Sequence, residues 1–228
     1  GMGELHLDVL VRRVIDDFKV QAKVGQPQVS YRESITAEAT HREKYHKVIA
    51  GKENSADLTI RVRPMRRGSG NHFENAVKPE KLPREFAEAV QRGVSSAFSS
   101  GIALGYPAID IGATVVDAVV NPGASTALAF EAAAALGFDE ACRKASPVLL
   151  EPIMKVDVLV PREFLGDVLG NLTARKGDIV RIESRQRVES IHAHVPLATM
   201  FGYSTALRSS TQGRATFSME FSHFAPRN

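Results

Sequence analysis

The chain has 228 residues, 43% of them hydrophobic, which is enough for one or two domains with buried cores. Its 29 Lys and Arg residues against 26 Asp and Glu residues leave a formal net charge of +3, too small to indicate nucleic-acid binding by itself. The single cysteine excludes a disulfide within the chain, and no apolar run approaches the roughly 20 residues of a membrane span, so we expect a soluble, intracellular protein.

The first 24 residues are expected to belong to a different domain from the rest. Apolar residues at helical spacing over 7–19 predict a helix, and alternation over 20–24 predicts a strand. Gly25 and Pro27 then mark a boundary. One helix and one strand cannot bury both of their apolar faces alone. Residues 1–24 are therefore expected to be the end of an otherwise missing domain, or a strap on the next one.

The next segment, residues 25–147, is predicted to be a domain that mixes strands and helices. Alternating apolar residues predict strands near 29–33, 45–49, 58–63 and 109–115. Turns are predicted at Gly68-Ser69-Gly70 and at Asn121-Pro122-Gly123, because these residue types favour turn conformations.

Two helices are predicted in the same segment. The first begins at Pro83, a residue type favoured at the first helical position, and stops at Gly101. The second is rich in alanine, runs to about Lys144, and is expected to be capped by Ser125 or Thr126. One side of this second helix is expected to carry Leu128, Ala132, Ala135 and Cys142.

The last segment, residues 148–228, has the clearest periodicity. It predicts strand 153–160, helix 161–171, strands 178–185 and 188–195, helix 198–209 and strand 213–222. This βαββαβ order is typical of a ferredoxin-like fold. Alternation within the first strand places Met154, Val156, Val158 and Val160 on one face of the sheet.

No residue pattern in the chain indicates a catalytic centre. The phosphate-binding pattern Gly-x-x-x-x-Gly-Lys-Ser/Thr is absent, since Gly51-Lys52 has neither the first glycine nor the hydroxyl residue. His192 and His194 would share one strand face and could ligate a metal, but no acidic or cysteine cluster accompanies them, and surface or RNA-facing histidines are the favoured interpretation. Cys142 is expected to be a packed thiol rather than a nucleophile.

Basic residues gather in two short stretches. Four arginines lie within residues 61–67, and a Lys and several Arg residues lie within 175–187. Such clusters usually form a solvated face, but they are also the residue types that contact nucleic-acid phosphates. The candidates for RNA-backbone contacts are Arg61, Arg63, Arg66, Arg67, Arg175, Lys176 and Arg208.

Several motifs spread along the chain resemble the C-terminal part of elongation factor G. They are Gly1-Met2-Gly3-Glu4-Leu5-His6-Leu7, Arg67-Gly68-Ser69-Gly70, and residues 24–33, 150–154, 175–177 and 195–208. The resemblance implies the end of a third domain over residues 1–24, an S5-like fourth domain over 25–147 and a ferredoxin-like fifth domain over 148–228. The expected class is α+β, with an S5-like βαβ domain followed by a ferredoxin-like βαββαβ domain.

Two loops depart from the translocating members of that family. Translocases carry a Gly-Gly-x-Gly-Gln-Tyr-Gly run in the first loop, and a His and an Asp-Ser-Ser in the second, whereas residues 50–56 and 120–126 carry neither. The Pro-Gly-Ala-Ser-Thr form is similar to the mitochondrial-type second elongation factor G, which splits ribosomes with the recycling factor. In the family both loops form a tip that enters the decoding centre, and here we expect a polar, stiff tip. The candidate tip residues are Gly51, Lys52, Glu53, Asn54, Ser55, Asn121, Pro122, Gly123, Ser125 and Thr126.

The resemblance implies a ribosome-binding fragment of a translational GTPase, of a recycling or otherwise non-translocating type. A true translocase is the first alternative, and a ribosomal protection protein a weaker one. A stand-alone RNA-binding module and an enzyme with an unrecognised site are alternatives from other classes.

The same resemblance sets the expected ligands and partners. No cofactor and no metal are expected in this chain, while GTP and magnesium are expected in the missing N-terminal half of its parent. The expected partners are the ribosome, near its factor-binding site and decoding centre, and a ribosome recycling factor, with no membrane. The expected location is the cytoplasm or, in a eukaryote, the mitochondrial matrix.

Overall fold

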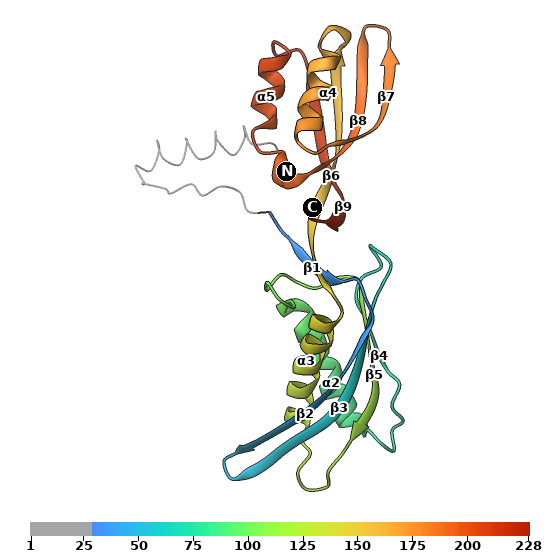
Figure 1. Cartoon of the computed structure of the whole chain (residues 1–228), viewed down its shortest axis with the longest axis vertical. Helices are drawn as coiled ribbons and strands as arrows, with labels where there is room; N and C mark the ends of the chain where they lie inside the picture. Colours follow the sequence, from blue (N-terminus) through green and yellow to red (C-terminus); the bar gives the residue numbers. More distant parts are fainter. Residues whose placement is uncertain (1–28) are drawn as a thin grey trace, which may run out of the picture. The chain divides into compact units, whose positions relative to one another are not determined.

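The computed structural model describes residues 29–228, so the helix and strand predicted within residues 1–24 lie outside the described part of the chain. The described residues form two compact units (Figure 1). The first unit is Tyr31–Leu150 with Pro226–Asn228, and the second unit is Glu151–Ala225. Each unit has its own hydrophobic core.

The first unit contains a four-stranded sheet in the order β2-β3-β5-β4. β2 (Ala39–Ile49) and β3 (Lys52–Pro64) form a long antiparallel hairpin, and β3 also pairs antiparallel with β5 (Ile111–Val119). β4 (His72–Asn75), which was not predicted, lies parallel to β5 and is connected to it through α2 (Arg84–Ser100). This β4-α2-β5 crossover is the βαβ element expected of an S5-like domain.

Two helices, α2 and α3 (Ala127–Lys144), cover one face of this sheet (Figure 1). They bury the alternating apolar residues of β3, which include Leu58, Ile60 and Val62. The helices lie close together at Gly93, where an added Cβ would lie 2.3 Å from the backbone carbonyl oxygen of Glu131. A side chain at this position would force the helices apart, so glycine is the residue that fits the crossing.

The helix boundaries and the buried side of α3 correct two details of the prediction and decide a third. Pro83 is the N-cap of α2 rather than its first helical residue. Of the two candidate caps, Thr126 is the N-cap of α3, and its hydroxyl accepts the N–H of Ala129 at 3.1 Å. Cys142 is buried as expected, but Leu128 is 60% exposed. The apolar side was misplaced because a helix rich in alanine has little contrast between its faces.

A buried carboxylate ties the start of the first unit to the loop after α2. β1 (Arg32–Ile35) pairs antiparallel with the beginning of β6 (Pro147–Pro161) and carries Glu33, which is 2% exposed. The carboxylate of Glu33 accepts four backbone N–H groups, at 2.8 to 3.1 Å, from Ile102, Ala103, Leu104 and Tyr106. These bonds fix the loop in place, since four backbone donors depend on one buried acceptor group.

The second unit confirms the predicted βαββαβ order. β8 (Val188–Pro196) lies between β6 and β7 (Asp178–Arg185), and β9 (Thr216–Pro226) pairs with β6. α4 (Leu165–Ala174) and α5 (Tyr203–Ser210) cover one face of the sheet (Figure 1). The predicted inward alternation of β6 is also confirmed, because Val156, Val158 and Val160 are fully buried in this core.

The two units together confirm the α+β class. Within residues 29–228, no helix combines the length and apolar character needed to cross a membrane.

Candidate functional site

The β2–β3 hairpin ends in a turn of only two residues. Ala50 and Gly51 both have positive φ angles, 51° and 74°. Two successive positive φ angles are typical of the type I′ turn, whose twist matches that of the paired strands. The predicted loop over residues 50–56 is therefore wrong beyond the turn, because residues 52–56 already belong to β3.

The loop between β5 and α3 lies at the same end of the first unit as this turn (Figure 1). The N–H of Ser55 donates to the carbonyl oxygen of Ala124 at 2.8 Å. The hydroxyl of Thr126 donates to the side-chain oxygen of Asn54 at 2.9 Å, across 72 positions of sequence. The structure thus brings the two predicted loops together into one surface, which we call the tip.

The candidate tip residues differ in exposure. Asn54 and Ser55 are buried, and the Asn54 amide also donates to the carbonyl oxygen of Lys52 at 3.1 Å. These two residues hold the loops together, whereas Ser125 accepts the N–H of Asn121 at 2.9 Å and shapes the second loop from within. The exposed candidates are Gly51, Lys52, Glu53, Asn121, Pro122 and Gly123.

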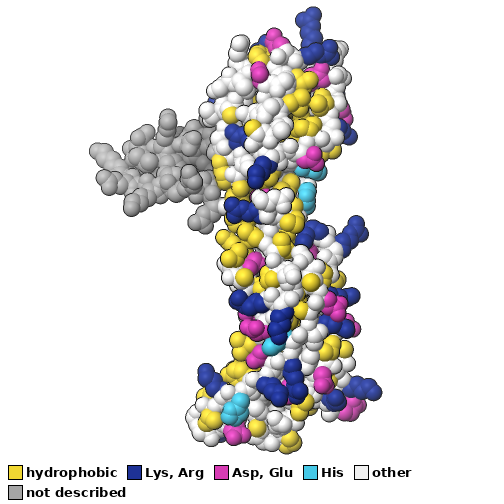
Figure 2. Space-filling model, viewed as in Figure 1, with side chains coloured by type: hydrophobic (Ala, Val, Ile, Leu, Met, Phe, Trp, Pro, Cys, Tyr) yellow, Lys and Arg dark blue, Asp and Glu magenta, His cyan; other side chains and the backbone are white. Residues whose placement is uncertain are grey.

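A pocket of about 620 Å³ opens between the two loops. Its walls include the apolar side chains of Ile49 and Leu128, which are 42% and 60% exposed. Figure 2 shows apolar side chains among charged ones at this end of the first unit. The tip therefore carries apolar side chains beside the polar ones that the sequence indicated. Sequence periodicity missed both residues because it assigned Leu128 to the buried side of α3 and Ile49 to the body of a strand.

Two of the candidate arginines lie on the open face of the first unit's sheet. Arg61 and Arg63 are exposed and alternate along β3 with the buried Ile60 and Val62, so they point away from α2 and α3. Arg42, on the neighbouring strand β2, makes two hydrogen bonds of 2.8 and 2.7 Å with Asp57. Arg61 and Arg63 are therefore placed where a phosphate backbone could reach them.

Arg67 has a structural partner instead. Its guanidinium donates to the buried carboxylate of Asp110 at 3.1 Å. The same carboxylate accepts the N–H groups of Gly68 and Gly70 at 3.1 and 2.9 Å. Asp110 thus fixes the predicted turn, and Arg67 takes part in that arrangement, while Arg66 is exposed beside it.

Arg175 is also held within the fold, at the C-terminal end of α4. Its guanidinium donates to the carbonyl oxygens of Thr199 and Phe201 at 2.5 and 3.0 Å, and to the side-chain oxygen of Asn171 at 3.0 Å. It also lies 5.2 Å from the ring centre of Tyr203, whose burial raises its pKa to about 12. Arg175 is therefore a residue that joins α4 to the turn before α5.

The other basic candidates of the second unit differ from Arg175. Lys176 and Arg208 are exposed. Lys176 has a positive φ of 59°, which places it in the left-handed turn after α4. These two residues keep the surface position expected of backbone-binding side chains.

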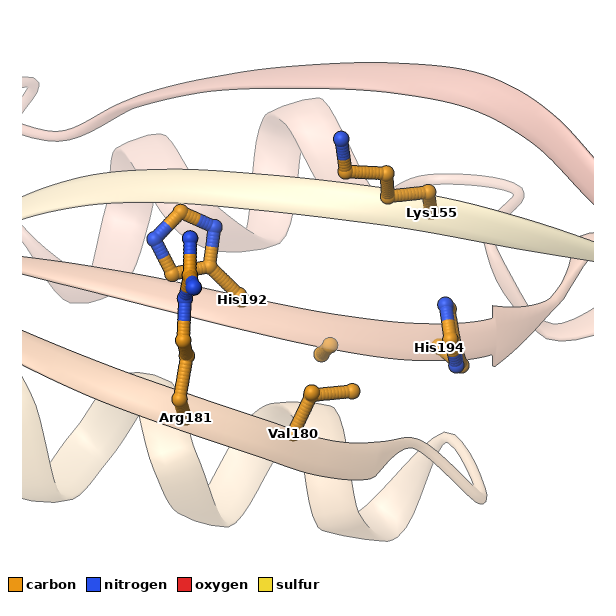
Figure 3. A pocket seen from close by; sticks show the side chains of 6 residues that line it. Lys155, Val180, Arg181, His192 and His194 are labelled. Carbon is orange, nitrogen blue, oxygen red and sulfur yellow. The ribbon is translucent and has the colours of Figure 1, made fainter.

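His192 and His194 lie on the sheet face of the second unit that the helices leave uncovered (Figure 3). The ring nitrogen Nδ1 of His192 is 2.5 Å from a carboxylate oxygen of Asp157, and Glu183 lies 3.9 Å from Nε2. His192 therefore has two acidic neighbours that the sequence did not indicate. Both acids come from neighbouring strands, and strand register is not visible in local sequence. Even so, no group of three His, Cys, Asp or Glu within residues 29–228 is arranged to hold a metal ion.

Cys142 is a packed thiol, as predicted. It is fully buried in the core of the first unit, and burial raises the pKa of the thiol above its ordinary value. A buried thiol that stays protonated is a poor nucleophile.

Comparisons with known proteins match both units. Residues 27–146 match the family described as elongation factor G, domain IV, and residues 148–228 match the family described as elongation factor G C-terminus. The chain is 53% identical over 233 residues to the protein named Elongation factor G 1 of Treponema denticola, which covers 98% of this chain and 34% of that protein.

A solved structure gives the same result. The crystal structure of a protein from Thermus thermophilus is similar with a TM-score of 0.88 and 36% identity, over 100% of this chain and 34% of that one. The chain therefore spans 34% of the length of each of these two relatives.

Proposed function

Because the chain belongs to the elongation factor G family, we propose that it is the part of a translational GTPase that binds the ribosome through its fourth and fifth domains. The observation that carries this proposal is the tip, where hydrogen bonds join two loops into one exposed end of the first unit. GTP and magnesium would bind in the N-terminal part of such a protein, since the chain has no phosphate-binding loop.

Arg61 and Arg63 are proposed to contact ribosomal RNA phosphates. Each phosphate contact releases counterions, so it adds about −0.7 to −0.9 to the slope of log affinity against log salt. We expect the double variant Arg61→Glu, Arg63→Glu to bind ribosomes at least about tenfold more weakly at low salt, and with a shallower salt slope. Co-sedimentation of the chain with ribosomes over a salt series measures both quantities.

The matched control reverses the charge at two arginines on the helical side of the same unit, in the double variant Arg84→Glu, Arg92→Glu. Both of these side chains are more than half exposed, and both lie on α2. The control is expected to bind with an unchanged salt slope. If the double β3 variant binds ribosomes as the wild type does, Arg61 and Arg63 are solvent-exposed residues that do not contact RNA.

Two activities of the parent protein fit the tip. Translocation of transfer RNA and message is the first candidate, favoured by 53% identity to a relative that is named as an elongation factor. Splitting of post-termination ribosomes with a recycling factor, as in the mitochondrial-type second elongation factor G, is the second. It is favoured by a two-residue turn without a glycine run and by a second loop without a histidine.

Thr126→Ala in the intact parent is expected to slow translocation at least about fivefold while ribosome binding is retained. The substitution removes the α3 cap and the bond to Asn54, so it loosens the tip at a cost of roughly 0.5–2 kcal/mol without unfolding the unit. Single-turnover translocation and subunit splitting should be measured on the same preparations, with the exposed Thr173→Ala as control. A parent that splits ribosomes with recycling factor but does not translocate would establish the second candidate instead.

A further inference from the structure

One histidine joins the edge strand of the first unit's sheet to the end of a helix. β2 is that edge strand, and within residues 29–228 its backbone pairs only with β3. The ring nitrogen Nε2 of His41, on β2, lies 2.9 Å from a carboxylate oxygen of Glu43. The other ring nitrogen, Nδ1, lies 2.8 Å from the ammonium nitrogen of Lys144, which is in the last turn of α3 and 103 positions further along the chain. The imidazole ring therefore connects β2 to α3.

These two contacts assign the protonation state of the ring. A lysine ammonium group has three N–H donors and no acceptor, so Nδ1 of His41 accepts from Lys144 and carries no proton. A neutral imidazole then has its proton on Nε2, which donates to the carboxylate of Glu43. His41 is thus the neutral tautomer with its proton on Nε2.

The ring and its acidic partner lie in the interface between the sheet and α3. The side chains of His41 and Glu43 are only 18% and 20% exposed. α3 passes close to Glu43, because a Cβ added at Gly137 would lie 3.1 Å from the Cβ of Glu43. Ile60, which lies opposite His41 on β3, is fully buried, and Tyr45 packs against the same core two residues after Glu43. The surroundings therefore leave the ring little room to change partners.

Other charged groups near this interface are more exposed or have partners of their own. On α3, Glu140 lies one turn before Lys144 and is exposed. Arg143, next to Lys144, donates to the carboxylate of Asp139 at 2.8 Å. Glu38, in the segment before β2, is exposed. The charges that act most directly on the ring are therefore those of the two groups in contact with it.

We propose that His41 is a proton-sensitive switch that holds β2, one strand of the hairpin that carries the tip, to the C-terminal end of α3. When Nδ1 takes up a proton from solvent, both ring nitrogens become donors, so the bond from Lys144 is lost and two cations lie next to each other. The bond to Glu43 is kept, because it becomes a charged pair. Proton uptake therefore releases Lys144, and β2 keeps its pairing with β3 but loses this attachment to α3.

NMR of the ¹⁵N-labelled histidine rings over a pH series tests the switch in the whole chain. At about pH 8, Nδ1 of His41 should give the signal of an unprotonated nitrogen and Nε2 that of a protonated one. Lys144→Met removes the ammonium group, so His41 is expected to titrate about 0.5–1 pH unit higher, and Glu43→Gln should move the midpoint down by a similar amount. His46 is the internal reference, because it is exposed on the opposite face of the same strand, and its midpoint should not move.

The matched control is Lys144→Arg, which keeps the cation and its donors and should leave the midpoint of His41 near the wild-type value. Hydrogen exchange reports the release itself. After correction for the intrinsic effect of pH, the amides of residues 39–45 should exchange about two- to tenfold faster below the midpoint, as expected for the loss of one hydrogen bond. In Lys144→Met they should already exchange faster above it. Lys144 is exposed, so this variant should keep its fold, and circular dichroism checks this.

Three results would each overturn the inference. The first is a proton on Nδ1 of His41 at about pH 8. The second is a midpoint that does not move in Lys144→Met. The third is a midpoint that moves while exchange in β2 stays the same, since proton uptake would then leave the strand attached. None of these measurements uses the ribosome, so the proposed function stands or fails independently of this switch.

Discussion

Replacing Glu33 by alanine is expected to lower the free energy of unfolding of the first unit by about 3–5 kcal/mol. The Glu33 carboxylate is the acceptor for four backbone N–H groups, and a buried donor that loses its partner, as that of Ile102 would, costs roughly 1–3 kcal/mol. Water that enters the vacated space would satisfy some of these donors, which brings the expected sum below four full penalties.

Hydrogen exchange measured by mass spectrometry localises this effect, because the two units need not unfold together. The amides of the loop over 102–106 should lose protection first in Glu33→Ala. Glu33→Gln is the matched control: it keeps one acceptor oxygen but turns an NH₂ group toward the other pair of donors. We expect it to be intermediate. Wild-type protection of the loop in the alanine variant would mean that the carboxylate is not what holds it.

Arg175→Glu is expected to destabilise the second unit by about 2–4 kcal/mol. The new side chain would lose three hydrogen bonds and the contact with the Tyr203 ring, and it would place a carboxylate beside the carbonyl oxygens of Thr199 and Phe201. Urea unfolding, with hydrogen exchange of the second unit's peptides, measures the change. Any weaker binding of this variant to ribosomes would therefore have a structural cause.

Lys176→Glu makes the same change of charge one residue later, on an exposed side chain. It is expected to leave stability within about 0.5 kcal/mol of the wild type. Any loss of ribosome affinity in Lys176→Glu would therefore indicate that this exposed side chain takes part in binding, because the fold is unchanged. Equal destabilisation by both variants would show that the Arg175 hydrogen bonds contribute little.

Periodicity predicted the helices and strands correctly wherever one face of an element was clearly apolar and the other clearly polar. β6 was predicted from the two-residue alternation of Val156, Val158 and Val160, which one face of a sheet requires. The prediction failed where that contrast was absent. α3 is rich in alanine, so its buried side was misplaced, and the short strand β4 has one residue, Phe73, packed against the core.

The site was predictable as two loops but not as a set of contacts. Turn residues marked 121–123, and the resemblance indicated that both loops belong to one tip. The bonds from Asn54 to Thr126 and from Asp157 to His192 join residues 72 and 35 positions apart. Such pairs depend on strand register and helix placement, which no local pattern encodes.

The long β2–β3 hairpin also determines how the tip can vary. Its register runs without a break from Ala39 opposite Val62 to Ile49 opposite Lys52, a reach of roughly 35 Å at about 3.4 Å per residue. A slip of one residue would turn Ile60 toward solvent and Arg61 toward α3, so the core prevents the arm from sliding. A substitution at Ala50 or Gly51 therefore changes the surface at the end of the hairpin but not the length of the hairpin. The turn can vary in sequence while the paired strands that support it stay in register.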